Sequence, residues 1–540
     1  MLRKIMSVFL LSCFLPAFLF SQNRQRLFDV GDEAYEWMQV LYLESSWTPP
    51  FPTQPASAEE ILLFLKRVDY DSLSEHGKNA YRALEDELDS EGVFRLADSL
   101  SVQANMNGSL EGYFKFDADS VWKHGYEDRL SMASLPLEFW FLDFLYAKTD
   151  VAMKESHGMV HVPGNYTNLF SAERTFAELD WNVPLNTVVS LGSHHWNVLY
   201  GRHQMKWGSG TTGSLLVSDY PDYYDTLTAH LYWDFFKYTV SYIGMDAYTA
   251  GDEAESYFVD AYKAFYAHRF DVRILDVARI SVTEAIMFGN RRPELRHFNP
   301  FFIFHNWFPD KYGNIGLLVE VALTPIEGLH LYGELVNTEI ETELDGDGRP
   351  TSSGYLLGSL VSMPLRIGYL GANVEYVHTD PWLYNRDTNL TTYSYHRLAR
   401  GNYPNPAEWI VKPFGYFLGP DTRMFFVGGS LRRPQSFSVE LGLYHYVQGE
   451  LSIDDEYLSL EDDYVDTPTG DPSSQNVLQL AVDVGHMPGI DIGFNLYMLW
   501  SDDQTDLLPA GGWDVQFAPY LSVDALALTE TLGVLFQEPQ

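Results

Sequence analysis

The most regular pattern along the chain is an alternation of apolar and polar residues between positions 490 and 500. The apolar positions are Ile490, Ile492, Phe494, Leu496, Met498 and Trp500. The polar face between them carries Asp491, Gly493, Asn495 and Tyr497. Because successive side chains of a β-strand point to opposite faces, this pattern predicts a strand with one apolar and one polar face. Similar alternation over residues 270–274, 280–286, 315–323 and 439–444 predicts further strands.

The first 21 residues have the character of a secretory signal peptide. Arg3 and Lys4 precede an apolar run over residues 5–20, and we expect cleavage after Ser21. After this leader, no apolar stretch reaches the roughly 18 residues that a membrane helix needs. Lipid cannot satisfy open backbone edges, so an exported chain of strands that crosses a bilayer must form a closed barrel. The alternative is a secreted sandwich or propeller, although no fixed-period repeat supports a propeller.

Residues 22–100 differ from the rest of the chain, and they predict a small helical module. Ser57 and Glu60 have the spacing of a capping box, which opens a helix with apolar residues along one face. Two further helices are expected, around residues 33–43 and 73–88.

Residues 101–540 predict the barrel, an all-β membrane β-barrel of about 16–18 antiparallel strands. Turn residues such as Glu327-Gly328 separate alternating segments and predict hairpins. Long polar insertions interrupt the strands, and in a barrel they belong on the outer face. These insertions are residues 339–354, 380–405 and 453–474.

Composition narrows the classes of function. The formal net charge is −39, so a nucleic-acid partner is not expected, because no surplus of cations is available for phosphates. Aromatic residues make up 15% of the chain, which suits the interfacial girdles of membrane barrels. The acidic stretches at residues 345–347 and 454–463 lack a complete calcium-loop spacing. With no hydrolase, phosphate-loop or metal-ligand motif, we expect no catalysis, no cofactor and no metal.

The most specific local sequence is Tyr200-Gly-Arg-His-Gln-Met-Lys-Trp-Gly-Ser-Gly210, followed by Thr211-Thr-Gly-Ser-Leu-Leu-Val-Ser-Asp219. On a strand, Met205 and Trp207 share one face, and Arg202 and Lys206 share the other. If Met205 and Trp207 face lipid, Arg202 and Lys206 point toward the lumen. The glycines that follow allow the strand to pass into a loop with tight or bulged backbone.

This segment resembles the capsule-assembly outer-membrane proteins of the Wzi family, whose strand reads Gly-Arg-x-x-x-x-Trp-Gly-x-Gly before a Leu-Leu-x-Ser-Asp-like stretch. Residues 268–285 with Asn299-Pro300 shortly after them, residues 314–337 and residues 419–423 agree with that family in order and character. The pair of helices before the strands also agrees with it. The resemblance covers most of the mature chain. It implies an 18-stranded barrel with a periplasmic helical bundle that binds exported capsular polysaccharide at the cell surface, without an open pore.

Two other functions remain open from the sequence. A substrate-selective porin would use the same fold as a channel, and a surface adhesin would bind through the long acidic loops. In each case we expect a monomer in outer-membrane lipid that depends on barrel-insertion and periplasmic chaperone machinery. The porin differs from the polysaccharide-binding protein in whether its lumen is open or plugged.

Two groups of residues are candidates for contact with a polysaccharide, each with a structural alternative. Trp382, Tyr384 and Arg386 combine aromatic faces with a hydrogen-bonding group, but an interfacial girdle or loop packing would use the same residues. Basic residues on predicted lumen faces could bind sugar carboxylates, or they could pair with lumen acids. These residues are Arg202, Lys206, Arg269, Arg273 and Arg279.

Overall fold

The computed structural model describes most of the chain after residue 22. The described residues are 23–88, 94–97, 99–169, 178–247, 262–290, 294, 299, 303–304, 313–339, 351–399, 408–434, 436–457, 466–487 and 489–529. The signal peptide predicted at residues 1–21 and the acidic segment at residues 345–347 lie outside them. Within the described part of the chain, no helix has both the length and the apolar character needed to span a bilayer.

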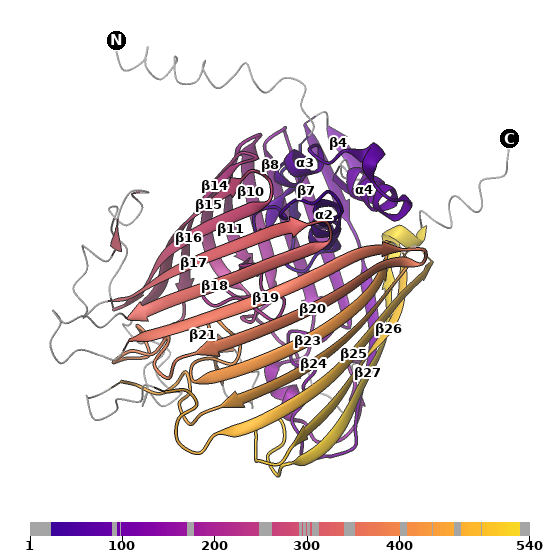
Figure 1. The fold of residues 1–540 in the computed structure, drawn as a ribbon. Helices are drawn as coiled ribbons and strands as arrows, with labels where there is room; N and C mark the ends of the chain where they lie inside the picture. Colours follow the sequence, from indigo (N-terminus) through magenta and orange to yellow (C-terminus); the bar gives the residue numbers. More distant parts are fainter. Residues whose placement is uncertain are drawn as a thin grey trace.

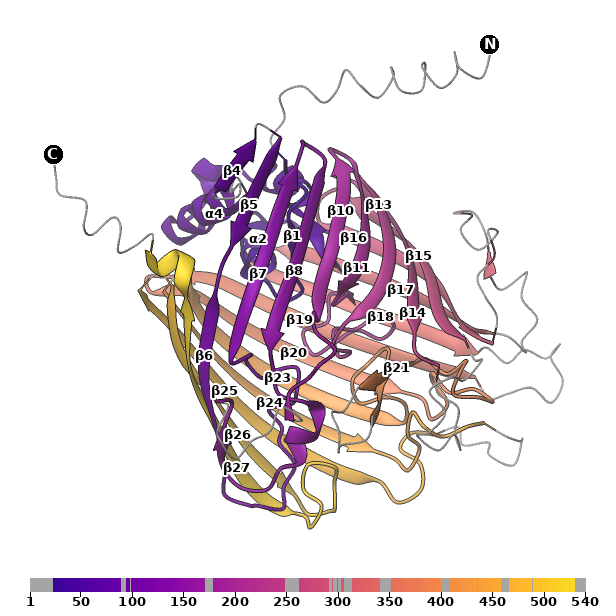
Figure 2. The same cartoon turned by 180° about the vertical axis from the view of Figure 1, so that it is seen from behind.

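The strands form one closed antiparallel barrel, as predicted (Figures 1 and 2). Among the described residues the barrel has 18 strands, and the first is broken into β5 and β6. The last strand pairs with β6, from Gln516 opposite Lys115 to Asp524 opposite Asn107, and this pairing closes the barrel. The barrel strands are β5 (Leu100–Ala104) with β6 (Asn107–Lys115), β7 (Ala133–Phe141), β8 (Leu145–Met153), β10 (Asn186–Ser193), β11 (Trp196–His203), β13 (Tyr224–Tyr232), β14 (Phe236–Met245), β15 (Lys263–Ile274), β16 (Ala278–Gly289), β17 (Gly313–Ile326), β18 (Leu329–Glu339), β19 (Ser352–Leu365), β20 (Gly368–Thr379), β23 (Thr422–Arg433), β24 (Phe437–Gln448), β25 (Ser473–Met487), β26 (Ile490–Ser501) and β27 (Gly512–Asp524).

Short strand pairs fix other segments of the chain. Strand β4 (Phe94–Ala97) pairs antiparallel with β5 at the edge of the wall, and β9 (Tyr166–Thr167) pairs with β6. The remaining pairs are β1 (Leu27–Phe28) with β3 (Ala56–Ser57), β2 (Thr53–Gln54) with β12 (Lys206–Trp207), and β21 (Ser394–Ala399) with β22 (Glu408–Pro413).

The alternation in sequence corresponds to the two faces of the barrel wall. In β26, Ile492 is 50% exposed on the outer surface, whereas Tyr497 is 3% exposed and faces the lumen. In β17, Leu317 and Leu323 are exposed, whereas Glu320 between them is fully buried. The predicted faces of these two strands are therefore confirmed. The outer face is the apolar surface that a barrel presents to lipid.

The helical segment also forms as predicted. Its helices are α2 (Glu33–Glu44), α3 (Ala58–Leu65) and α4 (Glu75–Leu88). The side chain of Ser57 accepts a hydrogen bond from the backbone N–H of Glu60 at 3.3 Å, which is the N-terminal half of the predicted capping box. Trp37, Leu41, Phe64 and Leu84 are among the buried residues that join the helices into one apolar cluster.

The helices lie inside the barrel at the end where the strands are joined by short turns (Figure 1). The backbone N–H of Gly328, in the turn between β17 and β18, donates to the carbonyl of Leu43 at 2.9 Å. Lys237 of β14 forms a buried ion pair with Glu60 of α3 at 2.7 Å. The helical module is therefore held against the barrel wall by backbone hydrogen bonds and an ion pair.

The other end of the barrel carries the long loops, and one of them turns inward. The described parts of the insertion between β20 and β23 include the β21–β22 hairpin. Tyr393 and Phe414 from this insertion are fully buried in the main apolar cluster of the lumen. The insertion predicted at residues 380–405 therefore belongs to a long connection at this end of the barrel, and part of it folds into the lumen, which the sequence did not predict. Its aromatic side chains are buried from water by filling the barrel.

Candidate functional site

The segment with the Gly-Arg-x-x-x-x-Trp-Gly-x-Gly pattern leaves the barrel wall and enters the lumen. Strand β11 ends at His203, and β12 then pairs with β2 of the N-terminal segment. Met205 and Trp207 are 1% and 2% exposed and belong to the apolar cluster inside the barrel. The prediction that they face lipid is wrong, because the chain has left the wall before it reaches them. We use the name inward loop for residues 204–221.

Glycines allow the inward loop to approach the wall closely. Gly208 has a φ of +151°, and a Cβ atom there would lie 2.1 Å from Oε1 of Glu334 on β18. A Cβ atom at Gly210 would lie 2.1 Å from the carbonyl oxygen of Gly213. No other residue fits these positions without displacing buried groups. The Gly-x-Gly spacing is thus explained by contact between the loop backbone and the wall.

Three buried carboxylates on neighbouring parts of the wall hold the inward loop. The hydroxyl of Ser209 donates to Glu320 at 2.6 Å, and the backbone N–H of Leu215 donates to Glu334 at 2.9 Å. Glu375 accepts from the backbone N–H groups of Thr211 and Thr212 at 2.5 and 2.9 Å. Sequence reasoning assigned no role to these carboxylates. Their position on the polar face of alternating strands was a signal that they point inward.

Two of the predicted arginines complete this network. Arg269 and Arg279 each donate to Glu320 at 2.6 Å, and Arg269 also pairs with Asp271 at 2.9 Å. Arg279 reaches the carbonyl oxygen of Pro50 at 2.7 Å, which joins the wall to the N-terminal segment. The pairing with lumen acids, one of the two interpretations left open from the sequence, accounts for both guanidinium groups.

Arg273 has a different environment, against the helical module. Its guanidinium lies over the rings of Tyr42 and Phe64, with distances to the ring centroids of 5.1 and 5.8 Å. The closest acidic partner is Asp276, at 3.4 Å. Arg273 therefore packs the barrel against the helices.

Arg202 and Lys206 lie apart from each other because only the first belongs to the wall. Arg202 shares the outward face of β11 with Tyr200, which is 68% exposed, so the prediction that Arg202 points toward the lumen is wrong. Arg202 donates to both oxygens of Asp225, its partner in the β11–β13 register, at 3.0 and 3.1 Å. Its guanidinium also lies 4.0 Å from the centre of the Tyr223 ring. Lys206 is carried into the lumen by the inward loop, where it lies 3.7 Å from Asp219.

The aromatic loop residues predicted to contact sugars are packed inside the protein. Trp382 is 6% exposed and makes an edge contact with Tyr457, with the ring centroids 5.1 Å apart. Tyr384 is fully buried, and its hydroxyl donates to the carbonyl of Leu215 in the inward loop at 2.7 Å. Arg386 is also 6% exposed. Tyr384 thus joins the insertion to the inward loop, and Trp382 joins it to the loop that carries Tyr457.

An ion-pair network fastens the loops together at the long-loop end. Arg397 of β21 lies 3.0 Å from Asp180 and 3.2 Å from Asp222, which belong to two other loops. Lys412 of β22 also pairs with Asp222, at 2.8 Å. Burial alone would raise the pKa of Asp180, but Arg397 and hydrogen-bond donors around it lower that pKa to about 2. The sequence could not identify this network, because its members are far apart along the chain.

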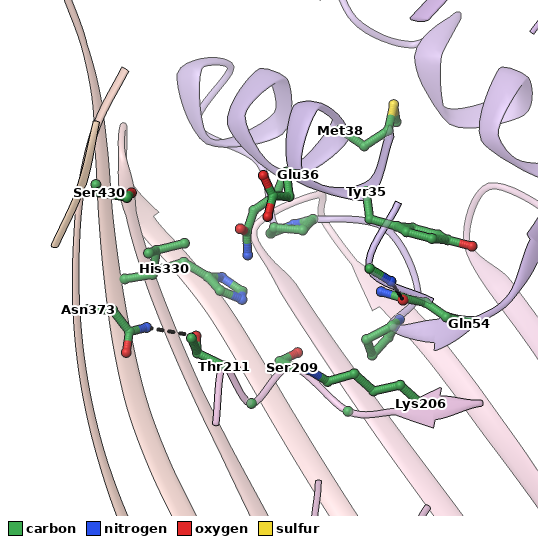
Figure 3. Close-up of a pocket in the computed structure, with 18 of the residues that line it drawn as sticks. Tyr35, Glu36, Met38, Gln54, Lys206, Ser209, Thr211, His330, Asn373 and Ser430 are labelled. Carbon is green, nitrogen blue, oxygen red and sulfur yellow. Dashed lines mark hydrogen bonds between the residues drawn. The ribbon is translucent and has the colours of Figure 1, made fainter. Parts of the chain in front are cut away.

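A cavity of about 430 Å³ remains in the lumen between the helical module and the wall (Figure 3). Helix α2 and the inward loop form two of its sides, and strands β20, β23 and β24 form the third. Its volume is within the usual range for small-ligand sites. Of the basic residues predicted from the sequence, Lys206 and Arg279 line it. Other polar lining residues include Gln39, Gln54, Asn373, Ser430, Glu440 and Gln479.

Two aromatic side chains lie against the glycine-rich wall of this cavity. Phe426 and Tyr444 form a pair with ring centroids 4.7 Å apart. A Cβ atom at Gly428 would lie 2.6 Å from the Phe426 ring, and one at Gly442 would lie 3.0 Å from it. Because the glycines have no Cβ atom, the Phe426 ring has room to lie along the wall. Sequence reasoning identified neither the aromatic pair nor these glycines.

These features define a class: a closed 18-stranded antiparallel barrel with a helical N-terminal module, which is the architecture of outer-membrane barrel proteins. No protein-family model matches the chain, and no curated protein does. Among solved structures, the chain is similar to Wzi, described as an outer membrane protein involved in group 1 capsule assembly in Escherichia coli and as a carbohydrate-binding β-barrel. The TM-score is 0.57 at 12% identity, and the match covers 92% of this chain and 99% of that chain.

The chain is also similar to two barrels from Pseudomonas aeruginosa. For OccD3 (OpdP), the TM-score is 0.40 at 9% identity, and the match covers 78% of this chain and 91% of that chain. For OprD, the TM-score is 0.40 at 11% identity, with 78% of this chain and 94% of that chain covered. At these identities the likeness concerns the fold.

Proposed function

We propose that this protein is an outer-membrane barrel that binds surface or capsular polysaccharide and helps attach or assemble it at the cell surface. The barrel lies in outer-membrane lipid as a monomer, and the helical module lies in the periplasm. The protein makes and breaks no covalent bonds in this role. Membership of a Wzi-like family is part of the same proposal.

The observation that carries this proposal is the filling of the lumen by the chain itself. The helices occupy the short-turn end, the inward loop crosses the middle, and the β21–β22 hairpin packs at the long-loop end. Each part is fixed by buried polar contacts, such as those of Glu60, Glu375 and Asp222. A barrel built in this way suits a binding or anchoring role better than passage of solutes.

The likeness to Wzi supports the same conclusion. That protein is described as a carbohydrate-binding barrel involved in capsule assembly, and the match extends along 92% of this chain. The lumen also contains the chemistry that sugars need, because aromatic rings and amide and carboxylate groups line one cavity. Aromatic surfaces supply apolar contact, and the polar groups exchange hydrogen bonds with hydroxyls.

The alternative of a substrate-selective channel is favoured by one part of the wall. Lumen-facing polar residues of β25 and β26 are only half-buried, namely Gln479, Asp483 and Asn495. They leave a hydrated surface along one side of the interior. A channel would need this surface to continue past the long-loop end.

Two measurements on purified, folded protein distinguish these functions. In a planar bilayer, we expect no steady conductance from protein shown to be inserted. In a pull-down with total surface polysaccharide from the source cells, we expect retention of the glycan. A steady nanosiemens-scale conductance together with no glycan retention would overturn the proposal in favour of the channel.

A further inference from the structure

The cavity beside α2 offers no free cation to an acidic ligand. Its basic lining residues are Lys206, Arg279 and Arg432, and each has an acidic partner. Lys206 lies 3.7 Å from Asp219, and Arg279 lies 2.6 Å from Glu320. Arg432 lies 2.5 Å from Glu36 and 2.6 Å from Glu440. A carboxylate or phosphate that entered would compete with carboxylates already bound.

The same lining is rich in groups that exchange hydrogen bonds with hydroxyls. Besides its paired carboxylates, the cavity is lined by Gln39, Gln54, Ser430 and Gln479. A sugar hydroxyl both donates and accepts hydrogen bonds, so it matches amide, hydroxyl and carboxylate groups alike.

The shape of the cavity fixes the side from which a ligand enters. Toward the short turns, the lining residues are exposed or half-buried, as in Gly31, Glu36, Arg432 and Glu440. Toward the long loops, Phe426 is 5% exposed and packs with Tyr444 against the aromatic core of the inward-folded insertion. The burial of these lining residues therefore indicates that the cavity opens toward the helical end of the barrel and closes toward the loops.

We propose that this cavity binds an uncharged glycan segment from the helical side, with its sugar rings against Phe426 and Tyr444 and its hydroxyls on Ser430, Gln479 and Glu440. This site rests on the proposed function, which it extends by naming the place and the charge class of the glycan. The glycines at positions 428 and 442 allow the aromatic pair to lie along the wall, where a ring face can meet a sugar ring. Acidic glycans are disfavoured because every lysine and arginine among the described lining residues already has an acidic partner.

The test uses the full-length protein in detergent and an array of oligosaccharides, half of them neutral and half containing uronic acids, together with total surface polysaccharide from the source cells. Two variants change the cavity: Tyr444→Ala removes a ring, and Ser430→Phe fills the space beside Asn373. The matched control is Leu443→Ala, because Leu443 lies next to Tyr444 on the same strand but is 40% exposed on the outer face. Heat-dependent gel mobility verifies that each variant is folded.

We expect wild type and Leu443→Ala to bind neutral oligosaccharides, and each cavity variant to bind them about tenfold more weakly or worse. Binding confined to uronic-acid glycans, or unchanged in both folded cavity variants, overturns this site while polysaccharide binding stands. If the protein retains no oligosaccharide and no surface polysaccharide, the proposed function fails together with the site.

Discussion

Removal of the Glu375 carboxylate should release the inward loop from the wall. Glu375 is fully buried on β20 and accepts four hydrogen bonds, three of them from the inward loop. The loop donors are the backbone N–H groups of Thr211 and Thr212 and the hydroxyl of Thr212. The fourth donor is the hydroxyl of Tyr332, at 2.5 Å. We therefore choose Glu375→Ala as the principal perturbation and Glu375→Gln as a milder one.

The size of the effect follows from the number of bonds. A hydrogen bond to a charged group contributes about 1.5–3 kcal/mol, and the four share one acceptor, so they are not additive. We expect Glu375→Ala to destabilise the docked loop by about 3–5 kcal/mol, which raises the fraction of undocked loop roughly 10²–10⁴-fold. Glu375→Gln keeps one acceptor oxygen, and it should cost about 1–2 kcal/mol.

Hydrogen exchange of the peptide that contains residues 208–216 measures this change directly. Its amides should exchange faster in the order wild type, Glu375→Gln, Glu375→Ala, while the wall strands keep their protection. The matched control is Val374→Ala, whose side chain lies next to Glu375 in sequence but is 41% exposed on the outer face. Equal exchange in wild type and Glu375→Ala would refute the argument that this carboxylate holds the loop.

Three further predictions concern other contacts in the lumen and the loops. Gly208→Ala should lower the free energy of unfolding by about 2 kcal/mol, because its Cβ atom would lie 2.1 Å from Glu334. The control Gly244→Ala, whose Cβ atom would meet no atom within 4 Å, should leave the thermal gel-shift midpoint closer to that of wild type than Gly208→Ala does. Lys237→Met should cost about 3–5 kcal/mol because it leaves Glu60 buried without its cation, and adding Glu60→Leu should restore most of the loss in the same assay. The pKa of Asp180 is lowered from 3.8 to about 2, so the stability it contributes is present above pH 4 and is lost as the pH falls toward 2. The protection of its loop amides, measured as exchange rates corrected for the intrinsic pH dependence of exchange, should fall over this range, and Asp180→Asn should abolish the part of that fall which Asp180 causes.

The sequence predicts the wall of this barrel better than its interior. The strand around residues 490–500 and the hairpin at Glu327-Gly328 could be assigned because side-chain alternation and turn residues are local signals. The Ser57 cap could be assigned for the same reason. The pairing of Arg269 with Glu320 joins residues 51 positions apart, and that of Arg397 with Asp180 joins residues 217 positions apart. Such contacts depend on the barrel closure, which no local pattern specifies.

The error at Met205 and Trp207 has a physical cause that applies to plugged barrels in general. In an open barrel the lumen is wet, so an apolar side chain in a strand has one apolar environment, the lipid. When the chain fills its own lumen, a second apolar environment exists inside, and hydrophobicity no longer identifies the face. The neighbouring glycines were the more informative signal, because Gly208 and Gly210 fit only a backbone pressed against other groups. The same ambiguity affects tyrosine. Tyr384 and Tyr393 are buried in the core of the lumen, although tyrosines in a loop are equally typical of the aromatic girdle at a membrane interface.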